Sequence, residues 1–249
     1  MSGAALDRRT DSAGCFGKLP QRGDFVQRDL DAAFVDVWDG WLQGAVAATR
    51  DALGDLWLDR YLTAPVWCYV VGAQAVGARA HAGVLAPSVD RVGRCYPITI
   101  AAPVTSGTGT VEGAVDAWRQ WLDAATGLIL DVLAEGGAAE TFLEGVCHLG
   151  RPPLLPGPPG MQFAEPANVH PVEAAPLVLD GSAGLWWTDG SDLVAPCRVL
   201  APVGLPPAYA FAAFLDGDWA GHGWARANDA DALTAANRSA SGAGTEAEP

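Results

Sequence analysis

The sequence predicts an α+β fold: a mainly antiparallel sheet with long amphipathic helices packed on it, in a single domain. Two stretches, 30–53 and 111–132, place apolar residues every three or four positions, as amphipathic helices do. Between them, the apolar runs 66–71, 75–86 and 97–103 follow one another with short connections, which is typical of consecutive antiparallel strands. Half of the 249 residues are hydrophobic, so the chain can bury a sizeable core.

The chain is expected to become ordered at Gly14. Residues 1–13 are small and polar, and we expect a disordered leader there. Residues 14–26 alternate small, apolar and charged side chains, which favours a short strand followed by a turn. Gly17 and Gly23 would be free to adopt positive φ around that turn.

The first long helix is followed by a shorter helical turn over 57–62, which Pro65 ends. The three strand-like runs come next, and a charged loop bounded by Pro87 and Pro97 separates the last two of them. The buried stripe of the first helix is expected to contain Phe34, Trp38, Trp41, Ala45, and Ala48 or Thr49.

After the second long helix, which Gly136 and Gly137 should end, a shorter helix is expected over 138–146. Residues 150–176 are rich in proline and glycine and predict a surface segment without continuous regular structure. Strand-like runs at 177–179 and 185–188 are divided by a turn at 180–184.

The C-terminal part contains one more apolar stretch, 206–215, whose leading prolines favour a helix. The folded domain is therefore expected to span 14–225, and the composition of 226–249 predicts a disordered tail. Trp186 and Trp187 are neighbours on a strand and must point to opposite faces, so one of them is a candidate exposed interface anchor.

Charge and cysteine content exclude several classes of protein. The formal net charge of −14 and pI near 4.4 oppose binding to nucleic acid or to an anionic membrane surface. The five cysteines are odd in number and widely spaced, which indicates reduced thiols. The N-terminus lacks the apolar core of a signal peptide, and no run predicts a membrane span. We therefore expect a cytoplasmic protein without membrane insertion.

The templates for catalysis and cofactor binding all fail. A glycine-rich turn precedes Lys18, but Leu19-Pro20 follows it where a phosphate-binding loop needs a hydroxyl residue. Ser88 lies in no Gly-x-Ser-x-Gly motif, and the four histidines have no metal-ligand spacing. We expect no catalytic residue, no metal and no cofactor.

The charged loop between Pro87 and Pro97 has two interpretations. In the first, Asp90 caps the turn and pairs with an arginine, which shapes the loop. In the second, Arg91 and Arg94 present their guanidinium forks to a carboxylate or phosphate on a partner. The sequence leaves both open.

Four motifs follow one another in a fixed order along the chain. They are Gly14-x-x-Gly17-Lys18-Leu19-Pro20-x-x-Gly23-Asp24-Phe25, Trp38-x-x-Trp41-Leu42-Gln43, Tyr61-Leu62-x-x-Pro65-x-Trp67 and Gly83-Val84-Leu85-x-Pro87-Ser88-Val89-Asp90-Arg91-Val92-Gly93-Arg94. Together they resemble the TagF (ImpM) family, which is associated with bacterial type VI secretion systems. The resemblance extends from about Gly14 into the 206–215 stretch.

The resemblance implies a cytoplasmic accessory protein that restrains assembly of the secretion system after translation, by binding its forkhead-associated scaffold protein. Some relatives carry a PP2C-type phosphatase; here only the short tail follows, so no phosphatase activity is expected. Self-association is left open. The motif positions carried as candidate interaction or structural residues are Gly17, Lys18, Gly23, Asp24, Ser88, Asp90, Arg91 and Arg94.

Two other functions are kept as alternatives. A small enzyme or phosphate-ligand sensor would gather five charged residues in one concave site: Lys18, Asp24, Asp90, Arg91 and Arg94. A structural subunit of the secretion apparatus would instead be present in it in fixed stoichiometry.

Overall fold

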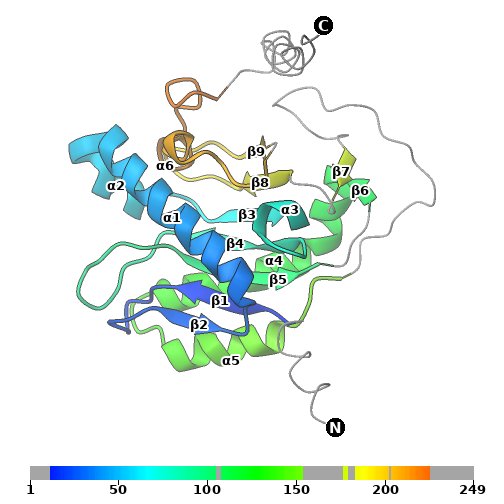
Figure 1. Cartoon of the computed structure of the whole chain (residues 1–249). Coiled ribbons are helices and arrows are strands. Elements are labelled where there is room, and N and C mark those ends of the chain that lie inside the picture. Colours follow the sequence, from blue (N-terminus) through cyan, green and yellow to red (C-terminus); the bar gives the residue numbers. More distant parts are fainter. Residues whose placement is uncertain (1–11, 105–107, 154–175, 179–182, 202, 225–249) are drawn as a thin grey trace, which may run out of the picture.

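A seven-stranded, entirely antiparallel sheet runs through the computed structural model, which describes residues 12–104, 108–153, 176–178, 183–201 and 203–224 (Figure 1). Its strands, in spatial order, are β2 (Val26–Arg28), β1 (Gly14–Gly17), β5 (Ile98–Pro103), β4 (His81–Ala86), β3 (Trp67–Val71), β8 (Gly184–Thr188) and β9 (Cys197–Ala201). A separate ribbon pairs β6 (Thr108–Thr110) with β7 (Pro176–Val178).

Helices cover both faces of the sheet. One face carries α1 (Ala32–Leu53), α2 (Trp57–Leu62), α3 (Ala73–Val76), α6 (Ala213–Asp216) and the 3-10 turns η1 (Gly54–Leu56) and η2 (Ala208–Ala210). The other face carries α4 (Val111–Leu133) and α5 (Ala139–Leu149). Two hydrophobic clusters result, one on each side of the sheet. The α+β class and the β3-β4-β5 meander predicted from the sequence are confirmed.

Helix α1 forms where the apolar periodicity predicted a helix. The Asp31 side chain caps its first turn by accepting a hydrogen bond from the Ala33 N–H at 2.9 Å, and Gly54 ends it at φ +50°. Trp38 lies at its centre, fully buried among the aromatic side chains of Phe34, Tyr69 and Trp186. Aromatic burial of this extent makes α1 the main cover of its face.

Helix α4 is the corresponding cover of the opposite face, and it is also confirmed. Trp118 and Trp121 are buried, and their indole N–H groups donate to the carbonyls of Pro153 (2.8 Å) and Gly150 (3.2 Å). These bonds tie the chain leaving α5 to the flank of α4. Among the described residues, no helix combines the length and apolarity that crossing a membrane requires.

Four details of the expected secondary structure are wrong. The expected strand over 75–86 begins as the single-turn helix α3, because a short apolar run suits a buried helical turn as well as a strand. The expected helix over 206–215 is divided into η2 and α6. Residues 177 and 178 of the expected run 177–179 belong to β7, which pairs with β6 and lies in a different sheet from β8. Strand β9 was not predicted at all.

The tryptophan pair on β8 corrects another expectation. Trp186 and Trp187 do point to opposite faces, since each joins a different hydrophobic cluster. Helices cover both faces, however, so Trp186 is fully buried and Trp187 is 9% exposed. Neither is an exposed interface anchor.

Several expectations concern residues outside the described ranges. Residues 1–11 of the expected leader 1–13 lie outside these ranges, and so do most of the proline- and glycine-rich segment 150–176 and the tail 226–249.

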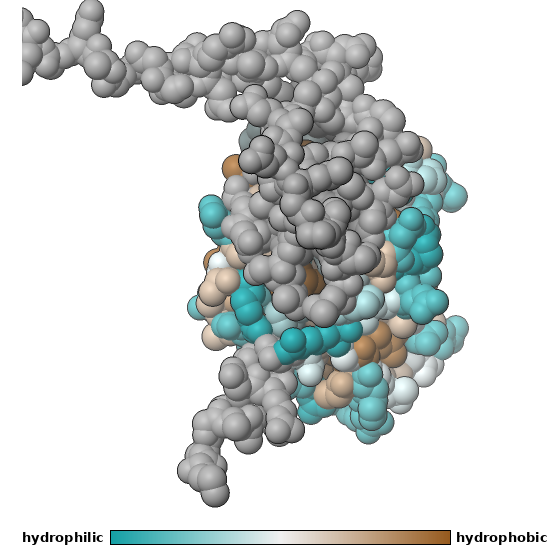
Figure 2. All heavy atoms as spheres, turned by 90° about the vertical axis from the view of Figure 1, so that its right-hand side faces the viewer, coloured by the Kyte–Doolittle hydropathy of each residue, from teal (hydrophilic) through white to brown (hydrophobic). Residues whose placement is uncertain are grey.

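On the side seen in Figure 2, the described surface is mainly hydrophilic, with smaller apolar areas between the hydrophilic ones.

Candidate functional site

Two loops that carry most of the candidate residues meet at one end of the sheet. The first loop (18–25) joins β1 to β2, and the second loop (87–97) joins β4 to β5. Gly17, at the end of β1, lies opposite Ile98, and Ile98 lies opposite Ala86, so β1, β4 and β5 place both loops at the same end. Figure 1 shows the two loops projecting on the left.

Glycine allows the backbones to approach closely where the loops begin. Gly17 has a φ of +141°, and a Cβ atom there would lie 2.1 Å from the Pro97 carbonyl oxygen. The positive φ expected at Gly17 is confirmed, whereas Gly23 does not adopt one. Gly17 is therefore required by packing at the root of the loops.

Asp90 organises the second loop. Its Oδ1 accepts hydrogen bonds from the backbone N–H groups of Val92 (3.0 Å) and Arg94 (2.9 Å). Backbone bonds from Asp90 N–H to the Arg94 carbonyl and from Gly93 N–H to the Asp90 carbonyl close the same turn. Gly93 completes it with a φ of +82°. This is the Asp-capped turn of the first interpretation.

The other carboxylate oxygen of Asp90 joins the two loops. Oδ2 accepts from Lys18 Nζ of the first loop at 2.9 Å and from Arg94 Nε at 2.6 Å. Lys18 is the only lysine of the chain, and its side chain is 8% exposed, while that of Asp90 is 0% exposed. A buried carboxylate between two cations, with two N–H donors on its other oxygen, is a fully satisfied group.

These bonds also set the ionisation of Asp90. Burial on its own would raise the pKa of its carboxyl group, but the hydrogen bonds from Lys18, the Arg94 backbone and guanidinium, and the Val92 N–H outweigh it. The net result is a pKa below the ordinary value, so Asp90 stays ionised. The charge network that joins the loops therefore persists at neutral pH.

Ser88 anchors the second loop to the rest of the domain. Its hydroxyl donates to the Lys18 carbonyl at 2.7 Å, which adds a second link between the loops. Tyr61 of α2 donates its hydroxyl to the Ser88 carbonyl (2.9 Å) and accepts from the Ser88 N–H (3.1 Å). Tyr96, at the other end of the loop, donates to Asp39 of α1 at 2.5 Å. Both ends of the loop are thus held by helices.

An aromatic cluster packs against the first loop. The Phe25 ring stacks on Phe16 at 5.5 Å and meets Tyr96 edge-on at 4.8 Å. Lys18 Nζ lies 5.1 Å from the centre of the Phe25 ring, within cation–π range. Phe25 is nevertheless 48% exposed, so one face of it is anchored and the rest is available at the surface.

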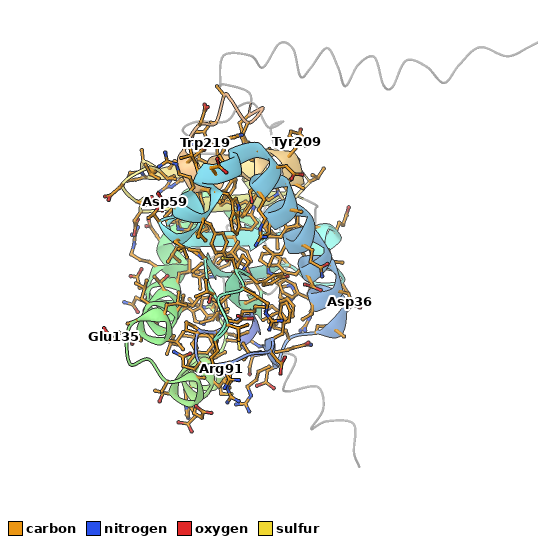
Figure 3. All side chains as sticks on the ribbon, turned by 90° about the vertical axis from the view of Figure 1, so that its left-hand side faces the viewer. Asp36, Asp59, Arg91, Glu135, Tyr209 and Trp219 are labelled. Atoms are coloured by element: carbon orange, nitrogen blue, oxygen red, sulfur yellow. The ribbon has the colours of Figure 1, made fainter. Side chains whose placement is uncertain are left out.

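The outer surface of the joined loops carries arginines. Arg94, whose side chain is 58% exposed, donates a further hydrogen bond to the Gly23 carbonyl, and Arg22 pairs with Glu140 of α5 at 2.5 Å. The backbone N–H of Arg91 donates to the Arg22 carbonyl at 2.9 Å. Figure 3 shows Arg91 at the end of the molecule opposite Tyr209 and Trp219.

The structure therefore divides the candidate residues into two groups. Gly17, Lys18, Ser88 and Asp90 are buried and hold the loops together. Asp24, Arg91 and Arg94 are exposed on the outside of the loops, with Gly23 between them and half-buried. Residues not chosen from the sequence also belong to the site: Arg22, Phe25, Tyr61, Val92 and Tyr96. Phe25, Tyr61 and Val92 stood within the family-like motifs, which was the available signal.

The geometry does not form the concave site of the enzyme or sensor alternative. Lys18, Asp90 and Arg94 do converge, but Lys18 and Asp90 are buried against each other. A cavity of about 830 Å³ lies elsewhere, between α4 and strands β3, β8 and β9, and a small apolar one of about 20 Å³ lies between α2, α6 and the root of the second loop. Neither is lined by Lys18, Asp90 or the loop arginines. Among the described residues, no His, Cys, Asp or Glu cluster is placed to hold a metal ion.

The fold and the site together define a class of α+β domains in which one antiparallel sheet carries two motif-bearing loops joined at its end. The model of the TagF N-terminal domain, described as type VI secretion system-associated, matches residues 14–149, more than half of the chain. This chain therefore belongs to the TagF family of type VI secretion system-associated proteins.

A solved structure supports the same assignment. The crystal structure of PA0076 from Pseudomonas aeruginosa PAO1 is similar at a TM-score of 0.67 and 33% sequence identity. The match covers 83% of this chain and 95% of that protein. A comparison with curated proteins found no match.

Proposed function

We propose that this TagF-family protein is a non-enzymatic, cytoplasmic negative regulator of type VI secretion, which acts after translation by binding the forkhead-associated scaffold protein of the system. The family membership supplies the secretion system, and the motif resemblance described above implies the regulatory role and the partner. One observation of the structure supports the non-enzymatic part: the buried polar motif residues Lys18, Ser88 and Asp90 are used in bonds that join the two loops.

The burial and bonding of Asp90 and Lys18 argue against a role in catalysis. An acid, base or nucleophile must reach a substrate, whereas Asp90 is buried and has all of its acceptor directions used. Lys18 is held between Asp90 and the Phe25 ring. A rigid projection whose buried side is fully bonded and whose outer side is exposed suits recognition of another protein.

The proposed function is tested with the purified chain and the purified full-length scaffold protein from the same secretion system. We expect saturable binding by isothermal titration calorimetry, and increased secretion when the gene is deleted. If the two proteins do not bind and deletion leaves secretion unchanged, the proposal is refuted. If the chain instead copurifies in fixed stoichiometry with the assembled apparatus, the structural-subunit alternative replaces it.

A further inference from the structure

Arg91 differs from the other arginines of the two loops because its guanidinium group is free. Arg22 is paired with Glu140, and Arg94 is held by Asp90 and the Gly23 carbonyl. Within the described part of the chain, Arg91 donates its backbone N–H to the Arg22 carbonyl, and no hydrogen bond or ion pair engages its guanidinium. A planar fork with five donors is thus left open to a ligand.

The guanidinium groups of Arg91 and Arg94 both lie at Gly23. A Cβ atom on Gly23 would lie 3.6 Å from an Nη atom of Arg91, and the Gly23 carbonyl accepts from Arg94. Arg22 precedes Gly23 directly and is exposed. Asp24, next in sequence, is an exposed carboxylate, and Glu140 is already paired with Arg22. The exposed charge of this cluster is positive in a chain whose net charge is −14.

The same two loops carry two exposed apolar side chains. Val92 follows Arg91 and is 67% exposed, and Phe25 is 48% exposed. Neither is loosely held, because the Val92 N–H is bonded to Asp90 and the Phe25 ring is stacked on Phe16. A protein interface typically combines arginine and aromatic anchors of this kind with a pre-ordered backbone.

The charge distribution selects the kind of partner. An anionic membrane or a nucleic acid would be repelled by the rest of this acidic chain. A folded protein with a local acidic site can contact the side of the loops that carries Arg91 and Arg94, and the negative charge elsewhere on this chain helps to orient its approach. The apolar pair also needs an apolar surface to cover it, which a protein provides.

We propose that Arg91, Val92 and Phe25 form the contact surface of this protein, and that it binds a folded partner on which a carboxylate lies beside an apolar hollow. The carboxylate pairs with the fork of Arg91, and Val92 and Phe25 fill the hollow. Arg22 and Arg94 add positive potential around the pair. The inference rests on the proposed function, because it identifies where and how the scaffold protein is recognised.

The test compares two charge reversals, R91E and R119E, in the full chain. Arg119 is an exposed arginine of α4, paired with Asp116, and does not belong to the loops. Both variants change the net charge equally, so a general electrostatic effect is shared by them. Binding of each to the purified full-length scaffold protein is measured by calorimetry, and circular dichroism and thermal unfolding verify that both variants keep the native fold.

We expect R91E to weaken the affinity at least about tenfold, as for an interface arginine at a hot spot. R119E should stay within about twofold of wild type, because an isolated exposed ion pair contributes little. V92S, which removes apolar area without changing charge, should also weaken binding. Raising the salt concentration should reduce wild-type affinity more than that of R91E.

The outcomes separate this inference from the function on which it rests. No binding by wild type would refute the proposed function. Wild-type binding that R91E and V92S leave unchanged would refute the surface and retain the function. An equal loss in R91E and R119E would mean that net charge, and not this surface, is recognised. Loss of wild-type binding after phosphatase treatment of the scaffold would identify the anion as phosphate and overturn its assignment as a carboxylate.

Discussion

Acidification should destabilise this protein through one histidine, His81, at the start of β4. The side chain is 3% exposed, its ring centre lies 4.3 Å from that of Phe34, and Nδ1 lies 3.0 Å from the Arg79 carbonyl. Since a carbonyl only accepts, Nδ1 carries the proton of a neutral imidazole. Burial is the main cause that lowers the pKa of His81 from 6.5 to about 4, with the Arg79 carbonyl and Asp31 opposing it and the Arg79 charge adding to it.

The magnitude follows from the difference in pKa between the folded and unfolded states. Above pH 6.5 the imidazole is neutral in both states and contributes no pH dependence. Below it, the unfolded chain binds a proton that the folded chain binds only near pH 4, so stability falls as the pH falls through this window. With a pKa lowered from 6.5 to about 4, the loss amounts to about 3 kcal/mol.

His81→Gln isolates this contribution, because glutamine does not titrate and keeps a donor for the Arg79 carbonyl. The free energy of unfolding is measured by urea titration at a series of pH values, with tryptophan fluorescence as the signal. Wild type should lose about 3 kcal/mol relative to the variant between pH 6.5 and about 4. The carboxylates, including Asp90, are common to both proteins and cancel in the difference. Parallel pH profiles, or an NMR titration of His81 near pH 6.5, would refute the reasoning.

Three further predictions concern the loops and the sheet. Tyr61→Phe removes the hydroxyl that bonds Ser88 and leaves a buried N–H unpaired, so urea denaturation should show a loss of about 1–3 kcal/mol; no loss would contradict the anchoring role. Gly83→Ala should lower the free energy of unfolding by at least about 1–3 kcal/mol in the same assay, because the added Cβ would lie 2.2 Å from the Ile100 carbonyl oxygen of β5. An unchanged urea midpoint would contradict this prediction. As the only lysine is buried, an amine reagent should modify Lys18 far more slowly in the folded chain than in urea, whereas equal rates would show that its ion pair is not maintained.

The long helices and the central strands were predictable because their signals are local. In α1, side chains that share the buried face recur with the helical period, so the sequence alone places Phe34 and Trp38 on one side. The meander of β3, β4 and β5 follows from apolar runs with short connections. Strand β9 was not predicted, because it contains Arg198 and lies at the edge of the sheet, where the alternation of apolar and polar residues is weak.

The motifs identified where the site lies but not what each residue does there. A capping aspartate and nearby arginines were visible within one loop, and the structure assigns Arg94 to Asp90. Lys18 is 72 positions away from Asp90, and nothing local indicates that its ammonium group completes the same network. The exposed role of Phe25 was equally hidden, since an aromatic residue within a motif is as compatible with a core position.

What the sequence by itself determined was the α+β class, the two long helices, the family resemblance and the acidic character of the chain, because each depends on composition or on residues close together along it. Only the tertiary structure decided which charged residues are structural and which are open to a partner. That distinction depends on pairing between β1, β5 and β4, whose register brings the two loops together and buries Lys18 against Asp90. With those charges satisfied internally, Arg91 is left exposed between Val92 and Gly23 with a free guanidinium group.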